Sequence, residues 1–159
     1  MENSREEKFM NIAIELSKRG ISGNSGGPFG AVVVKGDKIL GKGFNQVASK
    51  KDPTAHAEIM AIRAACAKLR TFDLSDCQMY TSCEPCPMCL GAIYWAKINQ
   101  IYYGNSRENA ASIGFDDHFI YKQMCGIPEN RSLSMIQISQ EQAFAIFKLW
   151  NIKPNKVVY

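Results

Sequence analysis

Two short motifs supply residues that could bind a metal and move protons. His56 and Glu58 form a His-x-Glu pair, and Cys86 and Cys89 form a Cys-x-x-Cys pair preceded by Pro85. An imidazole and two thiolates suit Zn²⁺, and three protein ligands leave the fourth tetrahedral position open to water, as in catalytic sites. We therefore predict one Zn²⁺ per chain, held by His56, Cys86 and Cys89.

Glu58 is the acidic residue that this ligand set leaves unused. Zinc lowers the pKa of bound water from about 15.7 to near 7, so the site needs a base that accepts the released proton. A carboxylate can take that proton, deliver it to a ring nitrogen and then protonate a leaving amine. The two motifs together are similar to the signature of zinc-dependent nucleobase deaminases, in which the glutamate is not a ligand. We expect Glu58 to be the catalytic residue.

Other interpretations of these residues stay open at this point. Cys83 precedes Cys86 by three residues, so three cysteines and His56 would also make a closed structural zinc site. A glutamate in the first turn of a helix is favourable simply because it complements the helix dipole. Residues two apart do not share a helical face, so His56 and Glu58 would both have to reach around the helix tip. If Glu58 has no chemical role, the chain would be a noncatalytic binding module that zinc stabilises.

Length and composition favour a single domain over residues 1–159. The chain has 159 residues, of which 46% are hydrophobic, and this is enough to bury a sizeable core. The first seven residues carry charges where a secretory peptide needs an apolar stretch, and no apolar run approaches the length of a membrane span. We expect a cytoplasmic protein without membrane contact. In that compartment the clustered cysteines favour metal binding over disulfides.

The apolar pattern predicts alternating helices and strands. Gly36-Asp37 is a tight-turn pair between two apolar runs, which indicates a hairpin, and Asp52-Pro53-Thr54 offers capping side chains before an alanine-rich helix. Pro85 suits the start of a helix that carries both cysteines in its first turn. The predicted strands are residues 29–34, 38–45, 78–82 and 101–103. A first helix is predicted from the apolar positions 9, 12, 13 and 16, with Gly20 and the glycines of residues 23–27 ending it, and further helices are predicted over residues 56–69, 85–97 and 107–113. Alternation of this kind favours a layered α/β sandwich with helices on both faces.

The C-terminal part of the chain gives weaker patterns. Residues 133–138 are predicted to be extended or a strand. Ser139 and the residues after it fit a capping box, and Phe144, Phe147 and Leu149-Trp150 would give the following helix an apolar face.

Several motifs resemble the bacterial guanine deaminases, a group within the zinc-dependent cytidine and deoxycytidylate deaminase family. The matching segments are residues 26–32, 52–58, 81–89, 91–95 and 114–117, and the terminal Tyr159. The first three segments recur in relatives with other substrates, so they fix the chemistry more firmly than the base. The resemblance implies a three-layer α/β/α sandwich of the cytidine-deaminase type, with a mixed central sheet.

The resemblance also implies a reaction and a set of roles. The reaction is the hydrolysis of guanine to xanthine and ammonia, with His56, Cys86 and Cys89 as zinc ligands and Glu58 as the proton shuttle. Asn45 matches the residue whose amide bonds the purine edge, Phe29 matches an aromatic ring that packs on the base, and Asp117 matches the carboxylate near the substrate amine. Without the resemblance, these three residues would be read as a strand end, a core residue and a loop or helix cap.

A homodimer is the expected assembly of such an enzyme. The resemblance implies that the C-terminal segment, roughly residues 120–159, is exchanged between two chains, so that Trp95 and Tyr159 complete the partner's pocket. The sequence departs from the guanine deaminases in residues 125–134, which leaves the path of this segment open. Taken alone, Tyr159 would be read as a frayed chain end.

The substrate alternatives are the nucleoside and RNA. Guanosine deaminases and tRNA adenosine deaminases share the zinc signature. The net charge of +4 is modest, and the C-terminal end has no dense group of arginines and lysines to hold an RNA backbone. We therefore expect a small-molecule purine base as the partner, with guanosine as the nearest competitor and nucleic acid as the weaker option.

Overall fold

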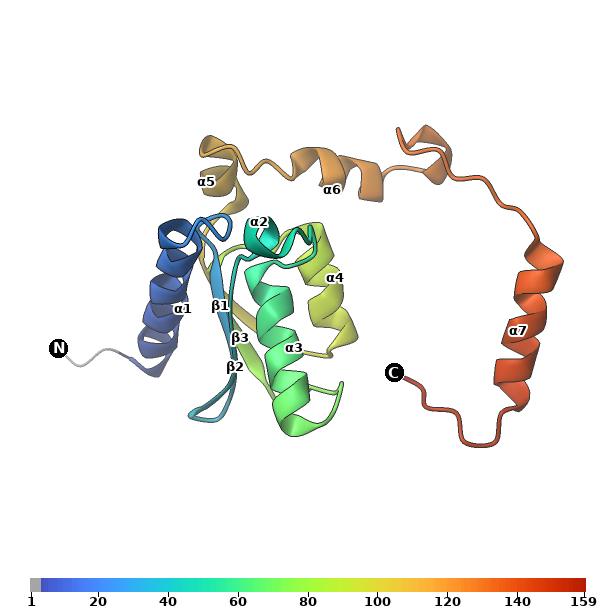
Figure 1. Cartoon of the computed structure of the whole chain (residues 1–159), viewed down its shortest axis with the longest axis horizontal. Coiled ribbons are helices and arrows are strands. Elements are labelled where there is room, and N and C mark those ends of the chain that lie inside the picture. Colours follow the sequence, from blue (N-terminus) through green and yellow to red (C-terminus); the bar gives the residue numbers. More distant parts are fainter. Residues whose placement is uncertain (1–3) are drawn as a thin grey trace. The chain divides into compact units, whose positions relative to one another are not determined.

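The chain divides into two compact units, Met1–Phe119 and Ile120–Tyr159. The computed structural model describes residues 4–159. Within that range, the N-terminal unit holds the β-sheet and both predicted zinc motifs, whereas the C-terminal unit is made of helices and irregular segments (Figure 1). The chemistry predicted from the motifs therefore depends on how the N-terminal unit folds.

Four strands form one mixed sheet in the order β2-β1-β3-β4. They are β1 (Gly30–Lys35), β2 (Lys38–Phe44), β3 (Gln78–Cys83) and β4 (Gln100–Asn105). β1 pairs antiparallel with β2 and with β3, whereas β3 and β4 run parallel. The predicted hairpin is confirmed: Gly36 and Asp37 join β1 to β2, and Gly36 has φ of +54°, a conformation that suits glycine. The mixed sheet was also predicted correctly.

Helix α1 (Arg5–Ser22) covers one face of this sheet. Ser4 begins the helix with a capping box: its hydroxyl accepts a hydrogen bond from the Glu7 backbone, and its own backbone N–H donates to the Glu7 carboxylate. The helical spacing of apolar residues then turns one stripe toward the strands. The cluster buried between α1 and the sheet comprises Phe9, Leu16, Val32, Val34 and Tyr80.

Helices α3 (Ala57–Leu69) and α4 (Pro87–Trp95) cover the opposite face. α3 lies very close to β2 because the residues that face each other are glycines on the strand and alanines on the helix. A Cβ atom on Gly41 would lie 2.1 Å from the Ala61 carbonyl oxygen, and one on Gly43 would meet the first turn of the same helix at 2.0 Å. The N-terminal unit is thus a three-layer α/β/α sandwich, as predicted (Figure 1).

Some local predictions differ from the structure. The short helix α2 (Val47–Lys50) was not predicted, whereas α5 (Arg107–Ser112) was. Asp52 and Thr54 were expected to cap α3, but this is wrong: the Asp52 carboxylate accepts hydrogen bonds from the Thr54 backbone and hydroxyl, at 2.8 and 2.7 Å. The Asp52 side chain closes its own loop instead, and the helix begins with His56 as its N-cap residue.

The C-terminal unit contains most of α6 (His118–Cys125), a 3₁₀ turn η1 (Pro128–Asn130) and α7 (Gln140–Ile152). The predicted capping box at Ser139 is wrong. Ser139 has a left-handed backbone with φ of +53°, and its side chain accepts no capping hydrogen bond. Residues 133–138 pair with none of the four strands, so their extended form is not part of the sheet.

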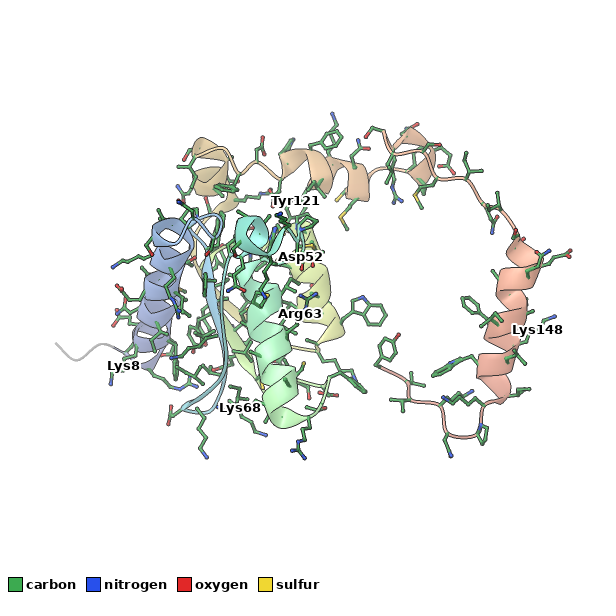
Figure 2. All side chains as sticks on the ribbon, in the orientation of Figure 1. Lys8, Asp52, Arg63, Lys68, Tyr121 and Lys148 are labelled. Atoms are coloured by element: carbon green, nitrogen blue, oxygen red, sulfur yellow. The ribbon has the colours of Figure 1, made fainter. Side chains whose placement is uncertain are left out.

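Within residues 4–159, no helix combines the length and the apolar composition needed to cross a membrane. Basic side chains are spread over both helical layers of the N-terminal unit: Lys8 lies on α1, and Arg63 and Lys68 lie on α3 (Figure 2). Arg63 is 3.9 Å from the Asp52 carboxylate. Lys8 therefore lies on the opposite face of the sheet from Arg63 and Lys68.

Candidate active site

The starts of two helices bring the predicted metal ligands together. His56 is the N-cap residue of α3 and Cys86 is that of α4, and both have extended backbones and no side-chain capping bond. α4 begins at Pro87, two residues later than predicted. Proline fits the first helical position, and here Pro87 occupies it. The positive ends of the two helices favour negatively charged sulfur. Both side chains are therefore available for a metal.

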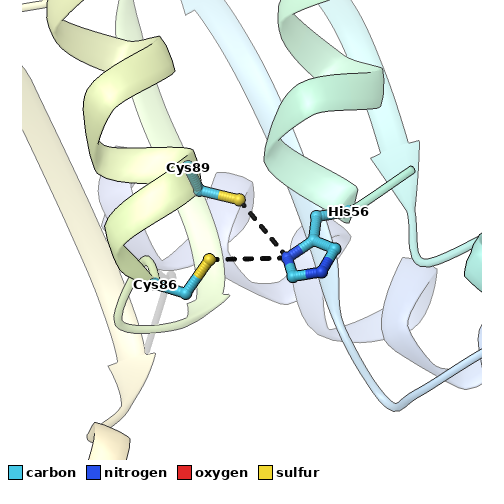
Figure 3. A group of neighbouring side chains, drawn as sticks. All are labelled: His56, Cys86 and Cys89. Carbon is cyan, nitrogen blue, oxygen red and sulfur yellow. Dashed lines mark hydrogen bonds between the residues drawn. The ribbon is translucent and has the colours of Figure 1, made fainter. Parts of the chain in front are cut away.

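Three ligand atoms form a compact group (Figure 3). His56 Nδ1 lies 3.5 Å from both Cys86 Sγ and Cys89 Sγ, and the three ligand atoms lie within 4.8 Å of one another. Metal–ligand bonds of about 2.0–2.3 Å separate tetrahedral ligands by roughly 3.3–3.8 Å, so this spacing suits zinc. The prediction that these three residues hold zinc is confirmed.

Cys83 does not join this group. Its thiol donates a hydrogen bond to the Ser106 carbonyl oxygen at 3.6 Å, and the ligand group found within the described residues consists of His56, Cys86 and Cys89 alone. The alternative of a closed structural site with four ligands is therefore wrong, and a zinc ion held by these three residues would keep a position for water or substrate.

Contacts among the three ligand side chains shift their pKa values. The contact with Cys89, followed by that with His56, lowers the pKa of the Cys86 thiol to about 4 against the effect of burial. The same contact with Cys86, followed by burial, raises the pKa of Cys89. The contact with Cys86 also raises the pKa of His56. Zinc needs both sulfurs as thiolates, so its binding has to release the Cys89 proton.

Glu58 lies beside the ligands without being one of them. Its side chain is 5% exposed; Oε2 accepts a hydrogen bond from Cys89 Sγ at 3.4 Å, and Oε1 accepts one from Thr81 Oγ1 at 3.1 Å. Burial raises the pKa of this carboxyl. His56 precedes the helix and Glu58 is its second residue, so both side chains reach the same place around the helix tip.

Thr81 is a site residue that the sequence reasoning missed. Side chains alternate along a strand, so Thr81 on β3 points to the same face as Met79, which packs in the cluster beneath α3. This alternation, combined with the predicted helix, would have placed its hydroxyl toward Glu58. Thr81 itself is fully buried.

Asn45 and Phe29 lie side by side where the hairpin ends. The Asn45 backbone N–H donates to the Phe29 carbonyl at 3.0 Å, and the next residue, Gln46, donates to the Ala55 carbonyl at 2.9 Å, immediately before His56. The Phe115 ring meets the Phe29 ring edge-on, with centroids 4.9 Å apart. The role of Phe115 was not predicted, although its motif was noted.

Asp117 lies within electrostatic range of the metal ligands. Burial raises the pKa of its carboxyl, the charge of Cys86 raises it further, and Arg107 lowers it. Trp95 is the last residue of α4, about 12 Å along the helix axis from Pro87 at its start. Tyr159 belongs to the C-terminal unit. The substrate roles predicted for Asn45, Phe29, Asp117, Trp95 and Tyr159 stay predictions.

Comparison with known proteins agrees with the motifs. Residues 3–105 match the cytidine and deoxycytidylate deaminase zinc-binding region. The chain is 46% identical over 153 residues to the guanine deaminase of Bacillus subtilis (strain 168), a match that covers 96% of this chain and 98% of that protein. The crystal structure of guanine deaminase from B. subtilis superposes with a TM-score of 0.93 at 45% identity and covers 99% of both chains.

Two further relatives match less of the chain. A crystal structure of a protein in complex with 2,6-diaminopurine superposes with a TM-score of 0.67 at 36% identity, covering 70% of this chain and 62% of that one. The tRNA-specific adenosine deaminase of Aquifex aeolicus (strain VF5) is 39% identical over 98 residues, 62% of this chain and 64% of that protein. The resemblance seen in the motifs is confirmed, and the chain belongs to the cytidine and deoxycytidylate deaminase zinc-binding family.

Proposed function

We propose that this chain is a zinc-dependent guanine deaminase, which hydrolyses guanine to xanthine and ammonia. The observation that carries the proposal is the buried Glu58 carboxylate, which lies 3.4 Å from Cys89 Sγ and yet is not a metal ligand. A structural zinc site has no use for such a carboxylate, whereas hydrolytic deamination needs a proton carrier there. The likeness to the guanine deaminase of B. subtilis over 96% of the chain supports guanine as the base.

The reaction replaces the exocyclic amine of guanine by oxygen. A bond forms between water oxygen and the carbon that bears the amine, the carbon–nitrogen bond breaks, and the amine leaves as ammonia. Zinc, when bound, makes water nucleophilic at neutral pH. Burial raises the pKa of Glu58, so its carboxylate accepts a proton from water more readily. The protonated side chain can then return this proton to the ring nitrogen and later to the leaving amine.

Three side chains of the N-terminal unit would bind the base. The Phe29 ring, held edge-on by Phe115, offers a surface on which a purine packs. The Asn45 amide offers hydrogen bonds to the purine edge. Asp117 would accept a hydrogen bond from the guanine amine and so reject bases that lack this donor. The electrostatic effect of Cys86 on Asp117 supports a position near the reacting carbon.

The proposal is tested by ammonia release from guanine, guanosine, adenine, cytosine and cytidine, measured in parallel with the zinc-loaded protein. We expect ammonia from guanine, with xanthine formed in equal amount. Faster turnover of guanosine would change the substrate and keep the mechanism. No ammonia from any of the five would contradict the proposal, and tRNA would then be the next substrate to test.

We also propose that the active enzyme is a homodimer in which residues 120–159 pack on the partner chain. Helix α7 exposes apolar side chains around its circumference, and α4 and β4 of the N-terminal unit expose Tyr94, Trp95 and Tyr103. Exposed apolar side chains gathered on one element mark an interaction surface, and a second copy of the chain would offer each of these surfaces a partner. The exposed apolar residues of α7 are Phe144, Ile146, Phe147, Leu149, Trp150 and Ile152.

In this assembly Trp95 and Tyr159 would help to complete the partner's pocket. A segment that packs on the partner would bring Tyr159 there, and its aromatic ring with a hydroxyl group would close over a purine. Light scattering during gel filtration tests the assembly. We expect the mass of two chains, and a stable, active monomer would contradict it.

We propose the cytoplasm as the compartment. All six cysteines are free thiols, and the metal site needs Cys86 and Cys89 as reduced ligands. A reducing compartment preserves both conditions. Fractionation of cells followed by immunodetection would place the protein in the soluble cytoplasmic fraction, and enrichment in a secreted fraction would contradict this.

A further inference from the structure

The Asn45 amide occupies space that only a glycine at residue 26 leaves open. A Cβ atom on Gly26 would lie 1.9 Å from Asn45 Oδ1 and 2.9 Å from Asn45 Cγ. Both distances are well inside van der Waals contact, which is about 3.5–4.0 Å between carbon atoms. Gly26 does not have a positive φ, so the backbone there would accept other residues. The position therefore requires glycine for space and not for conformation.

The backbones on both sides of this contact are held in place. The Gly26 N–H donates to the Gly20 carbonyl at the end of α1, at 3.2 Å, and the neighbouring Ser25 carbonyl accepts hydrogen bonds from Ala48 and Ser49 at 2.9 and 3.1 Å. The Asn45 backbone is fixed in turn by its hydrogen bond to Phe29. A methyl group at residue 26 would therefore displace the Asn45 side chain before it displaced the loop.

The orientation of the Asn45 amide is also fixed. The Val47 backbone N–H donates to Asn45 Oδ1 at 3.2 Å, and a backbone N–H can be met only by the oxygen of an amide. Asn45 is 4% exposed, and its Nδ2 donates no hydrogen bond to any residue between 4 and 159. The amide thus keeps two N–H donors for a ligand, and a purine edge carries ring-nitrogen and carbonyl acceptors.

We infer that Gly26 is a positioning residue for the purine: by lacking a side chain it lets Asn45 hold its amide with the N–H donors free for the base. This inference rests on the proposed function. Any side chain at residue 26 forces the amide to turn, which breaks its hydrogen bond with Val47 and moves the donors away from the purine acceptors. Gly26 acts through Asn45, whose atoms are the nearest ones to a Cβ at residue 26.

A double-mutant cycle of Gly26→Ala and Asn45→Ala separates this role from a general disturbance of the loop. We expect Gly26→Ala and Asn45→Ala each to lower kcat/KM for guanine by about ten- to a hundredfold, because each would remove the same hydrogen bond to the base. In the Asn45→Ala background, the side-chain amide that the new methyl would strike is absent, and the close contact that remains is the backbone oxygen of residue 45 at 3.1 Å. Gly26→Ala should therefore cause a much smaller further loss in that background. Zinc content should stay unchanged throughout.

Gly23→Ala is the matched control in the same loop. A Cβ atom on Gly23 would lie 3.2 Å from Ser25 Oγ, a hydroxyl that can rotate away, so this variant should keep wild-type kcat/KM. The urea midpoint gives a second cycle that needs no turnover: Gly26→Ala should lower the midpoint of the wild-type chain and lower that of the Asn45→Ala chain much less.

The outcomes distinguish the inference from the proposed function. Losses of kcat/KM or of urea midpoint that add in the double variant would overturn the role of Gly26, because the loop and not Asn45 would then carry the effect. Absence of ammonia from guanine in the wild-type chain would instead reject the proposed function. Non-additive losses in both measurements, with a normal Gly23→Ala control, are the expected result.

Discussion

The Thr81 hydroxyl donates a hydrogen bond to Glu58 Oε1 at 3.1 Å, from the middle of β3 to the first turn of α3. This bond joins the sheet to the carboxylate that moves protons in the proposed reaction. It occupies one carboxylate oxygen and leaves Oε2 beside the Cys89 sulfur. The sheet therefore fixes the orientation of a side chain that the helix alone would leave free to rotate.

Replacing Thr81 by valine keeps the shape of the side chain and removes this hydrogen bond. We expect kcat to fall roughly tenfold or more, because a hydrogen bond to a charged group contributes about 1.5–3 kcal/mol. Thr81→Ser retains the hydroxyl and should keep most of the activity. Steady-state kinetics with zinc analysis test this. Equal kcat for the valine and serine variants would show that the hydroxyl has no part in catalysis.

Asp117→Asn addresses the recognition of the guanine amine. The amide keeps the size of the carboxylate but removes a charge and one acceptor, so guanine turnover should fall by about ten- to a hundredfold. Zinc content should remain near one ion per chain. Kinetics and metal analysis on the same preparation give both quantities. A loss of zinc in step with activity would make Asp117 a structural support of the metal site.

The exchanged C-terminal segment predicts complementation between two inactive variants. A chain that lacks residues 155–159 keeps Glu58 but loses Tyr159, whereas Glu58→Ala keeps the tail. In a mixed dimer, one pocket would receive an intact Glu58 from the first chain and an intact tail from the second. The other pocket would lack both groups, so we expect each mixed dimer to recover up to about half the activity of a wild-type dimer. A verified mixed dimer without activity would argue against a shared pocket.

Asp73 gives a prediction for acid stability. Hydrogen bonds with Ser75, followed by the contact with Lys97 at 3.0 Å, lower its pKa from 3.8 to about 2. A lowered pKa in the folded state stabilises the protein above pH 3.8, and this contribution is lost as the pH falls through about 2. Urea unfolding at several pH values should show a shallower loss of stability below pH 4 for Asp73→Asn. Identical acid profiles for the variant and the wild type would contradict this.

The metal site could be predicted from the sequence because its chemistry is local. His56, Cys86 and Cys89 lie in two short motifs at helix starts, and the ligand types alone limit the metal. The layered fold was also accessible, since the hairpin turn at Gly36 and the alternation of helices and strands leave few arrangements.

The residues that sequence reasoning missed act through contacts between distant elements. Thr81 meets Glu58 only because β3 lies beneath α3, and Phe115 meets Phe29 only because the chain after α5 returns to the end of the hairpin. Ser139 shows the opposite error: its pattern fits a capping box, but its left-handed backbone turns the side chain away from the helix N–H groups. Local patterns predict elements, whereas tertiary contacts decide which side chains meet.

Removing the carboxylate at residue 58 while leaving the metal in place tests the central claim most directly. Glu58→Ala should retain about one zinc ion per chain, measured by mass spectrometry of the metal, because Glu58 is not a ligand. Its release of ammonia from guanine should fall by at least about a hundredfold, the usual contribution of a general acid–base residue. A variant that binds zinc and still produces xanthine at the wild-type rate would contradict the proposed mechanism.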